Sequence, residues 1–242
     1  MTKHAYLIGG GPGATDLITV RGLRALQAAD VILVDHLAPD VTELLGPDSR
    51  AEVIDVSKLP YGKQVAQEKI NELIVTHALA GRTVARLKGG DPYVFGRGYE
   101  ELQACREAGV PCSVIPGVTS AFAVPAAAGV PVTHRGATHA VTVVSGHLPP
   151  GHPKSLVDWA ALAHSGATLS VIMGVKNAPA IASALLEAGK PATTPAVVIQ
   201  EGTLSGQRIF ATTLAELGHT IISHEVHAPA VYVIGEVAGL TT

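Results

Sequence analysis

Cysteine, aromatic residues and charge are all scarce in this chain of 242 residues. Its two cysteines, Cys105 and Cys112, have a spacing that fits neither a disulfide framework nor a zinc site, which favours a reducing, cytoplasmic environment. The net charge of −3 provides no electrostatic footprint for nucleic acid. No apolar run is long enough to cross a bilayer and no signal peptide precedes the first strand pattern, so we expect no membrane partner.

Aliphatic residues dominate instead. Hydrophobic residues make up 47% of the chain but aromatic residues only 4%, so the core must be built mainly from valine, isoleucine, leucine and alanine. Short β-branched runs alternate with helical patterns, which predicts an α/β protein whose first half contains a largely parallel sheet. The strands expected there are 5–8, 31–34, 51–55, 83–87 and 112–115, and the helices are 17–28, 64–79, 99–108 and 119–128, with a loop at 58–63.

The pattern changes near residues 131–136, and a second α/β unit is expected beyond them. Its expected strands are 140–145, 168–173, 195–200 and 230–235, and its expected helices are 158–163, 178–188 and 213–217. We place the domain boundary at Arg135. This divides the chain into an N-terminal α/β domain with glycine-rich loops, residues 1–135, and a C-terminal α/β domain, residues 136–242.

The first glycine-rich loop, residues 9–14 (GGGPGA), loosely matches a dinucleotide-binding fingerprint. Asp35 ends the second expected strand, where an acidic residue could hold a ribose, so an NAD-dependent oxidoreductase is a rival interpretation. Two residues oppose it. Pro12 removes an amide from the loop, and Asp16 places a negative charge near the helix N-terminus where a pyrophosphate would bind.

The most specific signal is the segment 86–98, RLKGGDPYVFGRG, which follows an expected strand and precedes an expected helix. Gly89 and Gly90 allow the backbone to approach a ligand closely. Asp91 offers an acceptor at the carboxyl end of a strand, where ligands bind in open α/β sheets. Arg97 lies between two glycines and either projects toward a ligand or pairs with Glu101 on the surface.

A second loop, residues 115–120 (IPGVTS), ends on two hydroxyl-bearing residues. Thr119 or Ser120 can cap the following helix, and either hydroxyl can also face a ligand beside Gly117. This loop therefore supports both a structural and a ligand-binding interpretation.

Together these strings identify a resemblance. The strings are, in this order along the chain, GGGPG, LIT at 17–19, DHL at 35–37, RLKGGDPYVFGRGYEE, PGVTSA, GVPVTHRG and SGH. They resemble the tetrapyrrole methylase family, and in particular its uroporphyrinogen-III C-methyltransferase branch. The resemblance covers nearly the whole chain. It implies two α/β domains with the active site in the cleft between them, S-adenosylmethionine bound in a folded pose, and a homodimer.

The resemblance also implies roles for individual residues. The expected cofactor-binding residues are Pro12, Gly13, Gly89, Gly90, Asp91, Val94, Thr119, Ser120, Met173 and Gly202. Without the resemblance, Met173 would be interpreted as core at the end of a strand. The expected substrate-binding residues are Arg97, Glu100, Arg135 and His147, and the expected catalytic residues are Asp35 as general base, Lys58 as proton donor, and Arg97.

These roles have a chemical rationale. Attack by a pyrrole carbon on a methyl sulfonium places positive charge on the macrocycle, which must then lose a proton, and the Asp35 carboxylate can relieve that charge. Guanidinium groups bind the carboxylates of uroporphyrinogen III in a bidentate manner, so Arg97 and Arg135 are the leading anchors, with Lys88 and Lys58 behind them. Two features depart from the family pattern. The residues on either side of Lys58 differ from it, and His36 stands in place of the usual arginine.

We therefore expect methylation of uroporphyrinogen III at C2 and C7 to give precorrin-2, for sirohaem or cobalamin biosynthesis. The alternatives are a methylase of the same fold that acts on a later corrin intermediate, an NAD-dependent oxidoreductase, and a non-catalytic sensor of the tetrapyrrole. Eleven histidines invite a metal hypothesis, but they include no tight helical pair of ligands, and we expect no metal site.

Overall fold

The computed structural model describes residues 4–57 and 67–241. Lys58 and the loop expected at 58–63 lie outside the described residues. None of the helices within the described ranges combines the length and apolar character needed to cross a membrane.

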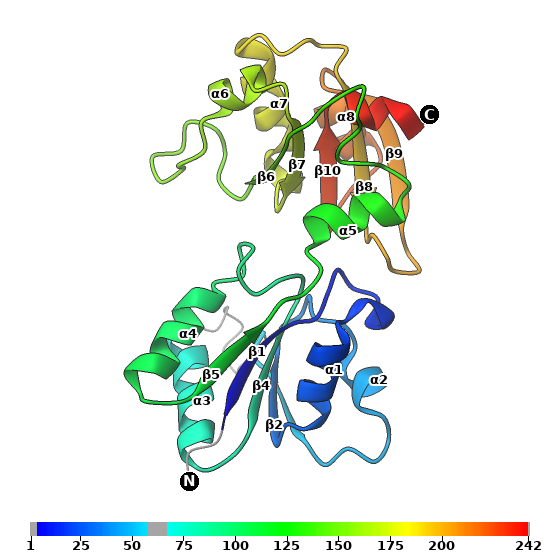
Figure 1. Ribbon diagram of the computed structural model, residues 1–242. Helices are drawn as coiled ribbons and strands as arrows, with labels where there is room; N and C mark the ends of the chain where they lie inside the picture. Colours follow the sequence, from blue (N-terminus) through cyan, green and yellow to red (C-terminus); the bar gives the residue numbers. More distant parts are fainter. Residues whose placement is uncertain (1–3, 58–66, 242) are drawn as a thin grey trace. The chain divides into compact units, whose positions relative to one another are not determined.

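The chain divides into two compact units, Met1–Thr119 and Ser120–Thr242 (Figure 1). The division falls before the boundary expected at Arg135. The reason is α5 (Ser120–Ala127), whose residues Ala121 and Val124 belong to a core cluster of the second unit. The Ala121 carbonyl also accepts a hydrogen bond from Ser170 Oγ, 2.7 Å away on a strand of that unit. The contacts of this helix, which the sequence pattern does not reveal, place it with the second unit.

The first unit is built on a five-stranded parallel sheet, as its alternating pattern predicts. The strands are β1 (Ala5–Gly9), β2 (Val31–Val34), β3 (Glu52–Asp55), β4 (Val84–Lys88) and β5 (Cys112–Ile115), in the order β3-β2-β4-β1-β5. Strands β2 and β5 have the predicted bounds. Because β4 lies between β2 and β1, it is central to the sheet and buried along its whole length.

The helices of the first unit are η1 (Thr15–Leu17), α1 (Val20–Gln27), α2 (Val41–Leu45), α3 (Gln67–Leu79) and α4 (Gly98–Glu107). The helix predicted at 17–28 is shorter, because α1 begins only after Thr19, whose hydroxyl accepts a hydrogen bond from the Gly22 amide at 3.1 Å. Helix α2 was not predicted. It is a short helix capped by Asp40, whose carboxylate accepts from the Thr42 amide at 2.8 Å.

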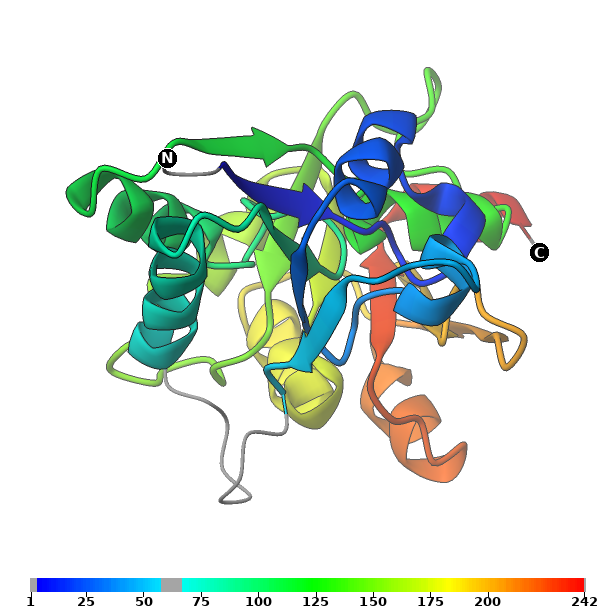
Figure 2. The same cartoon turned by 90° about the horizontal axis from the view of Figure 1, so that it is seen from below.

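Two helical layers cover the sheet of the first unit. Helices α3 and α4 pack on one face around Leu7, Leu33 and Val84, and α1 and α2 pack on the other around Ile8 and Leu87. The turned view shows the blue helix α1 and the teal helix α3 on opposite sides of the strands (Figure 2). Side chains alternate along a strand, so every second residue of β4 faces α3 and α4.

The second unit contains a mixed sheet. Its strands are β6 (Val141–Ser145), β7 (Thr168–Ile172), β8 (Pro195–Gln200), β9 (Arg208–Thr213) and β10 (Ala230–Ile234), in the order β6-β7-β10-β8-β9. Only β6 and β7 pair in parallel, whereas β10 is antiparallel to both of its neighbours and β9 is antiparallel to β8.

The helices of the second unit are α5, α6 (Trp159–His164), η2 (Val175–Asn177), α7 (Ala178–Glu187), α8 (Leu217–Ser223) and η3 (Glu236–Thr241). The helix predicted at 213–217 is wrong, because Thr213 ends the edge strand β9 and α8 begins only at Leu217. Strand β9 was missed. Its Ile, Phe and Thr residues favour a strand, but this edge strand is only partly buried, and the adjacent apolar residues Ile209 and Phe210 break the alternation of apolar and polar residues.

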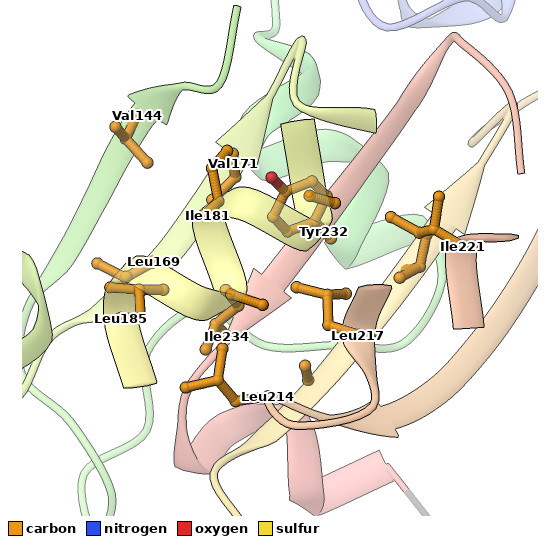
Figure 3. Close-up of a cluster of buried hydrophobic side chains, with 14 of the residues drawn as sticks. Val144, Leu169, Val171, Ile181, Leu185, Leu214, Leu217, Ile221, Tyr232 and Ile234 are labelled. Atoms are coloured by element: carbon orange, nitrogen blue, oxygen red, sulfur yellow. The ribbon is translucent and has the colours of Figure 1, made fainter. Parts of the chain in front are cut away.

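Tyr232 lies at the centre of the larger core of the second unit, which α6, α7 and α8 cover (Figure 3). It is fully buried among aliphatic side chains such as Val171, Ile181 and Leu217. Trp159 packs into the same cluster. The opposite face of the sheet packs against α5 and η3.

Candidate functional site

Two glycine loops meet at the carboxyl edge of the parallel sheet. The loop after β1 and the loop after β4 form an isolated bridge between Gly11 and Gly90. The Gly90 amide donates to the Gly11 carbonyl at 2.6 Å, and the Gly11 amide donates to the Gly90 carbonyl at 3.2 Å. Since all five strands are parallel, their carboxyl ends share this edge, where ligands bind in open α/β sheets.

The loop after β5 packs directly against this bridge. A side chain at Gly9 would collide with the Gly117 backbone nitrogen, and one at Gly117 would collide with the Gly90 carbonyl oxygen. Glycine is therefore required at both positions for close packing of backbone on backbone. The three loops therefore form one packed cluster, whose shape depends on glycine having no side chain.

Asp91 joins two of these loops by hydrogen bonds. Its Oδ2 accepts from the Gly117 amide at 3.0 Å, and its Oδ1 accepts from the Tyr93 amide at 2.8 Å. Hydrogen bonds from amides to a carboxylate are among the stronger kinds in proteins. Both carboxylate oxygens of Asp91 thus brace the loops, whatever further contact the residue makes.

The geometry of the first loop disfavours a dinucleotide. Its Gly10 amide donates to the Lys88 carbonyl at 2.8 Å and its Gly11 amide to Gly90, while Pro12 has no amide hydrogen. These groups are occupied within the protein rather than directed at a phosphate. The loop also leads into the short helix η1, and the sheet order places β4 between β1 and β2, unlike the usual dinucleotide-binding order.

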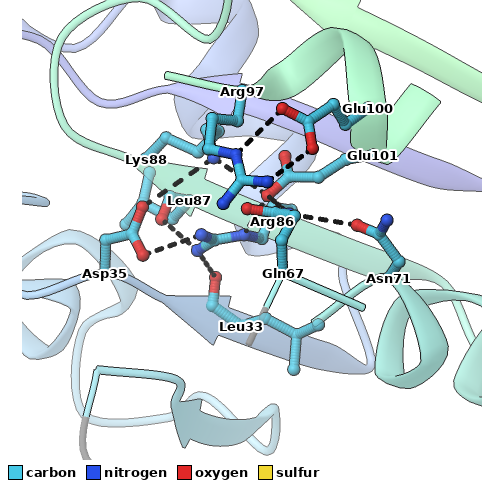
Figure 4. A network of polar contacts seen from close by, with 10 residues as sticks. All are labelled: Leu33, Asp35, Gln67, Asn71, Arg86, Leu87, Lys88, Arg97, Glu100 and Glu101. Carbon is cyan, nitrogen blue, oxygen red and sulfur yellow. Dashed lines mark hydrogen bonds and ion pairs between the residues drawn. The ribbon is translucent and has the colours of Figure 1, made fainter. Parts of the chain in front are cut away.

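A chain of charged side chains lies beside these loops, on the face of β4 that α3 and α4 cover (Figure 4). Arg86 Nη2 lies 2.7 Å from Asp35 Oδ1, and Arg86 Nε lies 3.0 Å from Glu101 Oε1. Lys88 Nζ lies 2.9 Å from the same Glu101 oxygen and 3.9 Å from Asp35 Oδ2. Two cations therefore connect two carboxylates.

Burial differs sharply along this chain of charges. The side chains of Arg86, Lys88 and Glu101 are 2%, 5% and 0% exposed, whereas that of Asp35 is 30% exposed. Glu101 Oε1 also accepts from Gln67 Nε2 at 3.2 Å. Among these four charged side chains, Asp35, the expected general base, is thus the one that reaches the surface of its unit.

Lys88 was expected to be a secondary substrate anchor, but its side chain is buried and paired inside the first unit. Burial, followed by the nearby Arg86 guanidinium, lowers the pKa of the Lys88 ammonium, while Glu101 and Asp35 act in the opposite direction. The sequence contains one indication that Lys88 is buried and paired with an anion. Two cations spaced two residues apart on a central strand share one face and need buried anions there.

Arg97 pairs with Glu100 rather than with Glu101. Arg97 Nε and Nη2 donate to the two oxygens of Glu100 at 2.9 and 2.6 Å, and both side chains are about half exposed. Glu101 instead faces the core of the unit. These hydrogen bonds raise the pKa of Arg97 and lower the pKa of Glu100. The Arg97 backbone has φ of +56°, a left-handed conformation that is uncommon for a residue other than glycine.

Five predicted site residues belong to the second unit, namely Ser120, Arg135, His147, Met173 and Gly202, whereas Gly13, Val94 and Thr119 belong to the loops of the first unit. Strands β6, β7 and β8 run in the same direction, because β7 and β8 are both antiparallel to β10 and β6 is parallel to β7. Their carboxyl ends therefore share one edge, which carries His147, Met173 and Gly202. Arg135 is exposed and precedes β6.

The loops at this edge are tightly interlocked. Asn177 Nδ2 donates to the carbonyl oxygens of Gly146 and His147 at 2.8 and 3.0 Å. Gly202 packs on Val124 so closely that a side chain there would collide with it. Met173 is 47% exposed and has φ of +57°, so it is not a core residue. A large apolar side chain held outward in a strained conformation indicates a contact surface.

Comparison with known proteins identifies the family. The sequence profile of the Tetrapyrrole (Corrin/Porphyrin) Methylases matches residues 4–218. The chain belongs to this family. A siroheme synthase of Pseudomonas fluorescens (strain Pf0-1) is 44% identical to this tetrapyrrole methylase over 240 residues, which are 99% of the chain and 51% of the relative. The chain thus spans about half the length of the curated relatives it matches.

Solved structures of the family have the same fold as this tetrapyrrole methylase. A uroporphyrin-III C-methyl transferase from Thermus thermophilus, complexed with S-adenyl homocysteine, is 36% identical with a TM-score of 0.81, and the match covers 98% of this chain and 94% of that one. A cobalt precorrin-4 methyltransferase is 27% identical with a TM-score of 0.85, and the match covers 97% and 95%. The predicted two-unit α/β fold is confirmed.

Proposed function

We propose that this tetrapyrrole methylase transfers methyl groups from S-adenosylmethionine to C2 and C7 of uroporphyrinogen III, giving precorrin-2 for sirohaem or cobalamin biosynthesis. The observation that carries the proposal is its similarity, along almost the whole chain, to a uroporphyrin-III methyltransferase whose structure contains the demethylated cofactor. The local chemistry of the first unit is consistent with this role.

The loops at the carboxyl edge of the first unit suit a cofactor with a positive centre. Residues 9–13, 89–94 and 115–119 contain a single charged side chain, that of Asp91, and no cation. A sulfonium therefore meets no like charge in these loops, whereas a pyrophosphate would find no cation there. When bound, S-adenosylmethionine supplies an electrophilic methyl group.

Residues of both units are proposed to hold the cofactor. In the first unit they are Pro12, Gly13, Gly89, Gly90, Asp91, Val94 and Thr119. In the second unit they are Ser120, Met173 and Gly202. The exposure and strained backbone of Met173 support its assignment, and the interlocked glycine loops give the first group a rigid frame.

Asp35 is proposed to take up the proton that the methylated macrocycle must lose. A carboxylate at about 4 Å from a positive charge attracts it by about 4 kcal/mol at an effective dielectric of about 20. Its partial exposure makes the Asp35 side chain accessible to a ligand, while its contact with Arg86 restricts its orientation. Lys58 as a proton donor stays a prediction, since it lies outside the described residues.

Arg97, Arg135 and His147 are proposed to bind the carboxylates of the substrate. Glu100 was predicted to bind the substrate as well, but an anion does not attract a polycarboxylate. Its bidentate contact with Arg97 supports a different part for it, namely holding the guanidinium in place. Homodimer formation and a cytoplasmic location remain proposals.

A methylase of a later corrin intermediate is the second candidate. The cobalt precorrin-4 methyltransferase superposes slightly better than the uroporphyrin-III enzyme but is less similar in sequence. Fold likeness alone does not assign a substrate. The greater sequence identity and the segment RLKGGDPYVFGRG favour uroporphyrinogen III.

The deciding experiment is incubation of the protein with uroporphyrinogen III and S-adenosylmethionine labelled in its methyl group. We expect label in a product that carries two added methyl groups, identified by mass spectrometry. Transfer to a later corrin intermediate alone would favour the second candidate. Absence of transfer together with tight NAD binding would refute the methyltransferase assignment.

A further inference from the structure

The four charged residues Asp35, Arg86, Lys88 and Glu101 form a cluster that we call the Asp35 clamp. Arg86 contacts Asp35 Oδ1 at 2.7 Å, and Lys88 lies 3.9 Å from Asp35 Oδ2. Each carboxylate oxygen of Asp35 therefore faces a different cation. Both cations meet at a single oxygen of Glu101, at 3.0 and 2.9 Å, so that the position of one depends on the position of the other.

Stability does not explain this arrangement. Removing a charged group from water costs several kcal/mol per ion, and apolar side chains of similar volume usually stabilise an interior at least as well. Three members of the clamp are nevertheless almost completely buried, beside the apolar cluster that includes Val84 and Leu102. The fourth member, Asp35, is partly exposed at the carboxyl edge of the sheet. The buried members thus converge on the side chain that can meet a ligand.

We propose that Glu101 and Lys88 are positioning residues for methyl transfer: Glu101 fixes Arg86 and Lys88, and these two cations hold the Asp35 carboxylate in the orientation that receives the proton from the macrocycle. This inference rests on the proposed function. Glu101 is fully buried and acts only through its neighbours. The Gln67 amide further restrains the shared Glu101 oxygen at 3.2 Å.

The protonation of Lys88 makes the clamp testable by pH. Within the described part of the chain, the charged groups that affect Lys88 are Arg86 on its own strand, Glu101 and Glu100 on α4, and Asp35 after β2. Burial and Arg86 lower the pKa of Lys88, so its ammonium loses a proton at a lower pH than an exposed lysine does. Above that pH, one oxygen of Asp35 loses its cation, and kcat should fall.

Three variants separate positioning from simple structure. Lys88→Arg keeps a positive charge at all accessible pH values, so the alkaline decrease in kcat should disappear. Lys88→Met is neutral and similar in length, so kcat should fall about 10- to 100-fold, the range expected when a reacting group is misplaced by about 1 Å. Glu101→Gln removes an anion that raises the pKa of Lys88, so the alkaline decrease should move to lower pH.

The matched control is Lys69→Met, which removes an exposed lysine paired with Glu72 on α3 and should leave kcat unchanged. The kcat and KM for uroporphyrinogen III are measured from about pH 6 up to about pH 10.5, the ordinary pKa of lysine, because the pKa of Lys88 is lowered from that value. The affinity for S-adenosylhomocysteine is measured by calorimetry, and thermal unfolding confirms that each variant is folded. We expect cofactor affinity and KM to stay close to wild type while kcat changes.

The inference is overturned if folded Lys88→Arg keeps the wild-type alkaline decrease, or if folded Lys88→Met retains wild-type kcat. Should neither lysine variant fold, an unshifted alkaline decrease in Glu101→Gln overturns it, as does a wild-type enzyme whose kcat shows no alkaline decrease. Under any of these outcomes, methylation of uroporphyrinogen III by the wild-type protein still supports the proposed function. A wild-type protein that methylates no tetrapyrrole refutes both.

Discussion

The Asp91 carboxylate accepts a hydrogen bond from the Gly117 amide at 3.0 Å and so joins the loop after β4 to the loop after β5. The same side chain accepts from the Tyr93 amide at 2.8 Å. The bond to Gly117 links segments that are distant in the sequence, at the edge where the cofactor is proposed to bind. It predicts that loop stability and cofactor affinity depend on one carboxylate.

Asp91→Ala should therefore weaken both properties. Loss of a hydrogen bond to a charged acceptor costs about 1.5–3 kcal/mol of unfolding free energy. Urea unfolding measures this loss, and calorimetry with S-adenosylhomocysteine measures the accompanying fall in affinity. Asp91→Asn, which retains one carbonyl oxygen as acceptor, should lose less of both. Wild-type stability in Asp91→Ala would show that the bond braces nothing.

Arg97→Ala should reduce turnover of uroporphyrinogen III while cofactor binding survives. The guanidinium is proposed to bind substrate carboxylates through charge-assisted hydrogen bonds, so kcat/KM should fall about 10- to 150-fold, which corresponds to about 1.5–3 kcal/mol. Arg106→Ala, which removes a more distant arginine of α4, serves as the control. An equal loss of affinity for S-adenosylhomocysteine in Arg97→Ala would show that the substrate role is misassigned.

Asp35→Ala should slow methyl transfer without altering cofactor affinity. Removal of a general base reduces a rate by about 10²- to 10⁴-fold. Single-turnover measurements with labelled cofactor report the transfer step directly. Asp48→Ala, which removes an exposed carboxylate, should be indistinguishable from wild type. Unchanged turnover in Asp35→Ala would remove this residue as the base and, with it, the reason for the Asp35 clamp.

Met173→Gly should have opposite effects on stability and on binding. A left-handed backbone costs a non-glycine residue about 1–2 kcal/mol, so glycine should raise the unfolding free energy, by less than this because it also gains freedom in the unfolded chain. Loss of the exposed thioether side chain should weaken S-adenosylhomocysteine binding. Glu225→Gly relieves a similar backbone, with φ of +50°, and should raise stability without any change in affinity. Unchanged affinity in Met173→Gly would exclude the cofactor contact.

Much of the fold could be predicted because its signals are local. The strands Val31–Val34, Cys112–Ile115 and Pro195–Gln200 have the predicted bounds, since each is a short aliphatic run between breaking residues. The glycine loops were also predictable, because backbone contact requires glycine in the sequence itself. Helix α2 was missed because it has only five residues, strand β9 was missed because its apolar and polar residues do not alternate, and the helix expected at 213–217 fell where this edge strand ends.

The sequence alone determined the family, and the proposed reaction and cofactor follow from it, because the motifs that carry the family are contiguous strings of residues. Only the tertiary structure decided which charges meet. Arg86 and Lys88 lie on β4 and Glu101 lies on α4, and no local pattern decides that Glu101 pairs with these two cations while Glu100 pairs with Arg97. Burial makes such pairings compulsory, because an unpaired charge in an apolar interior is too costly, and burial is a property of the packed chain rather than of any segment.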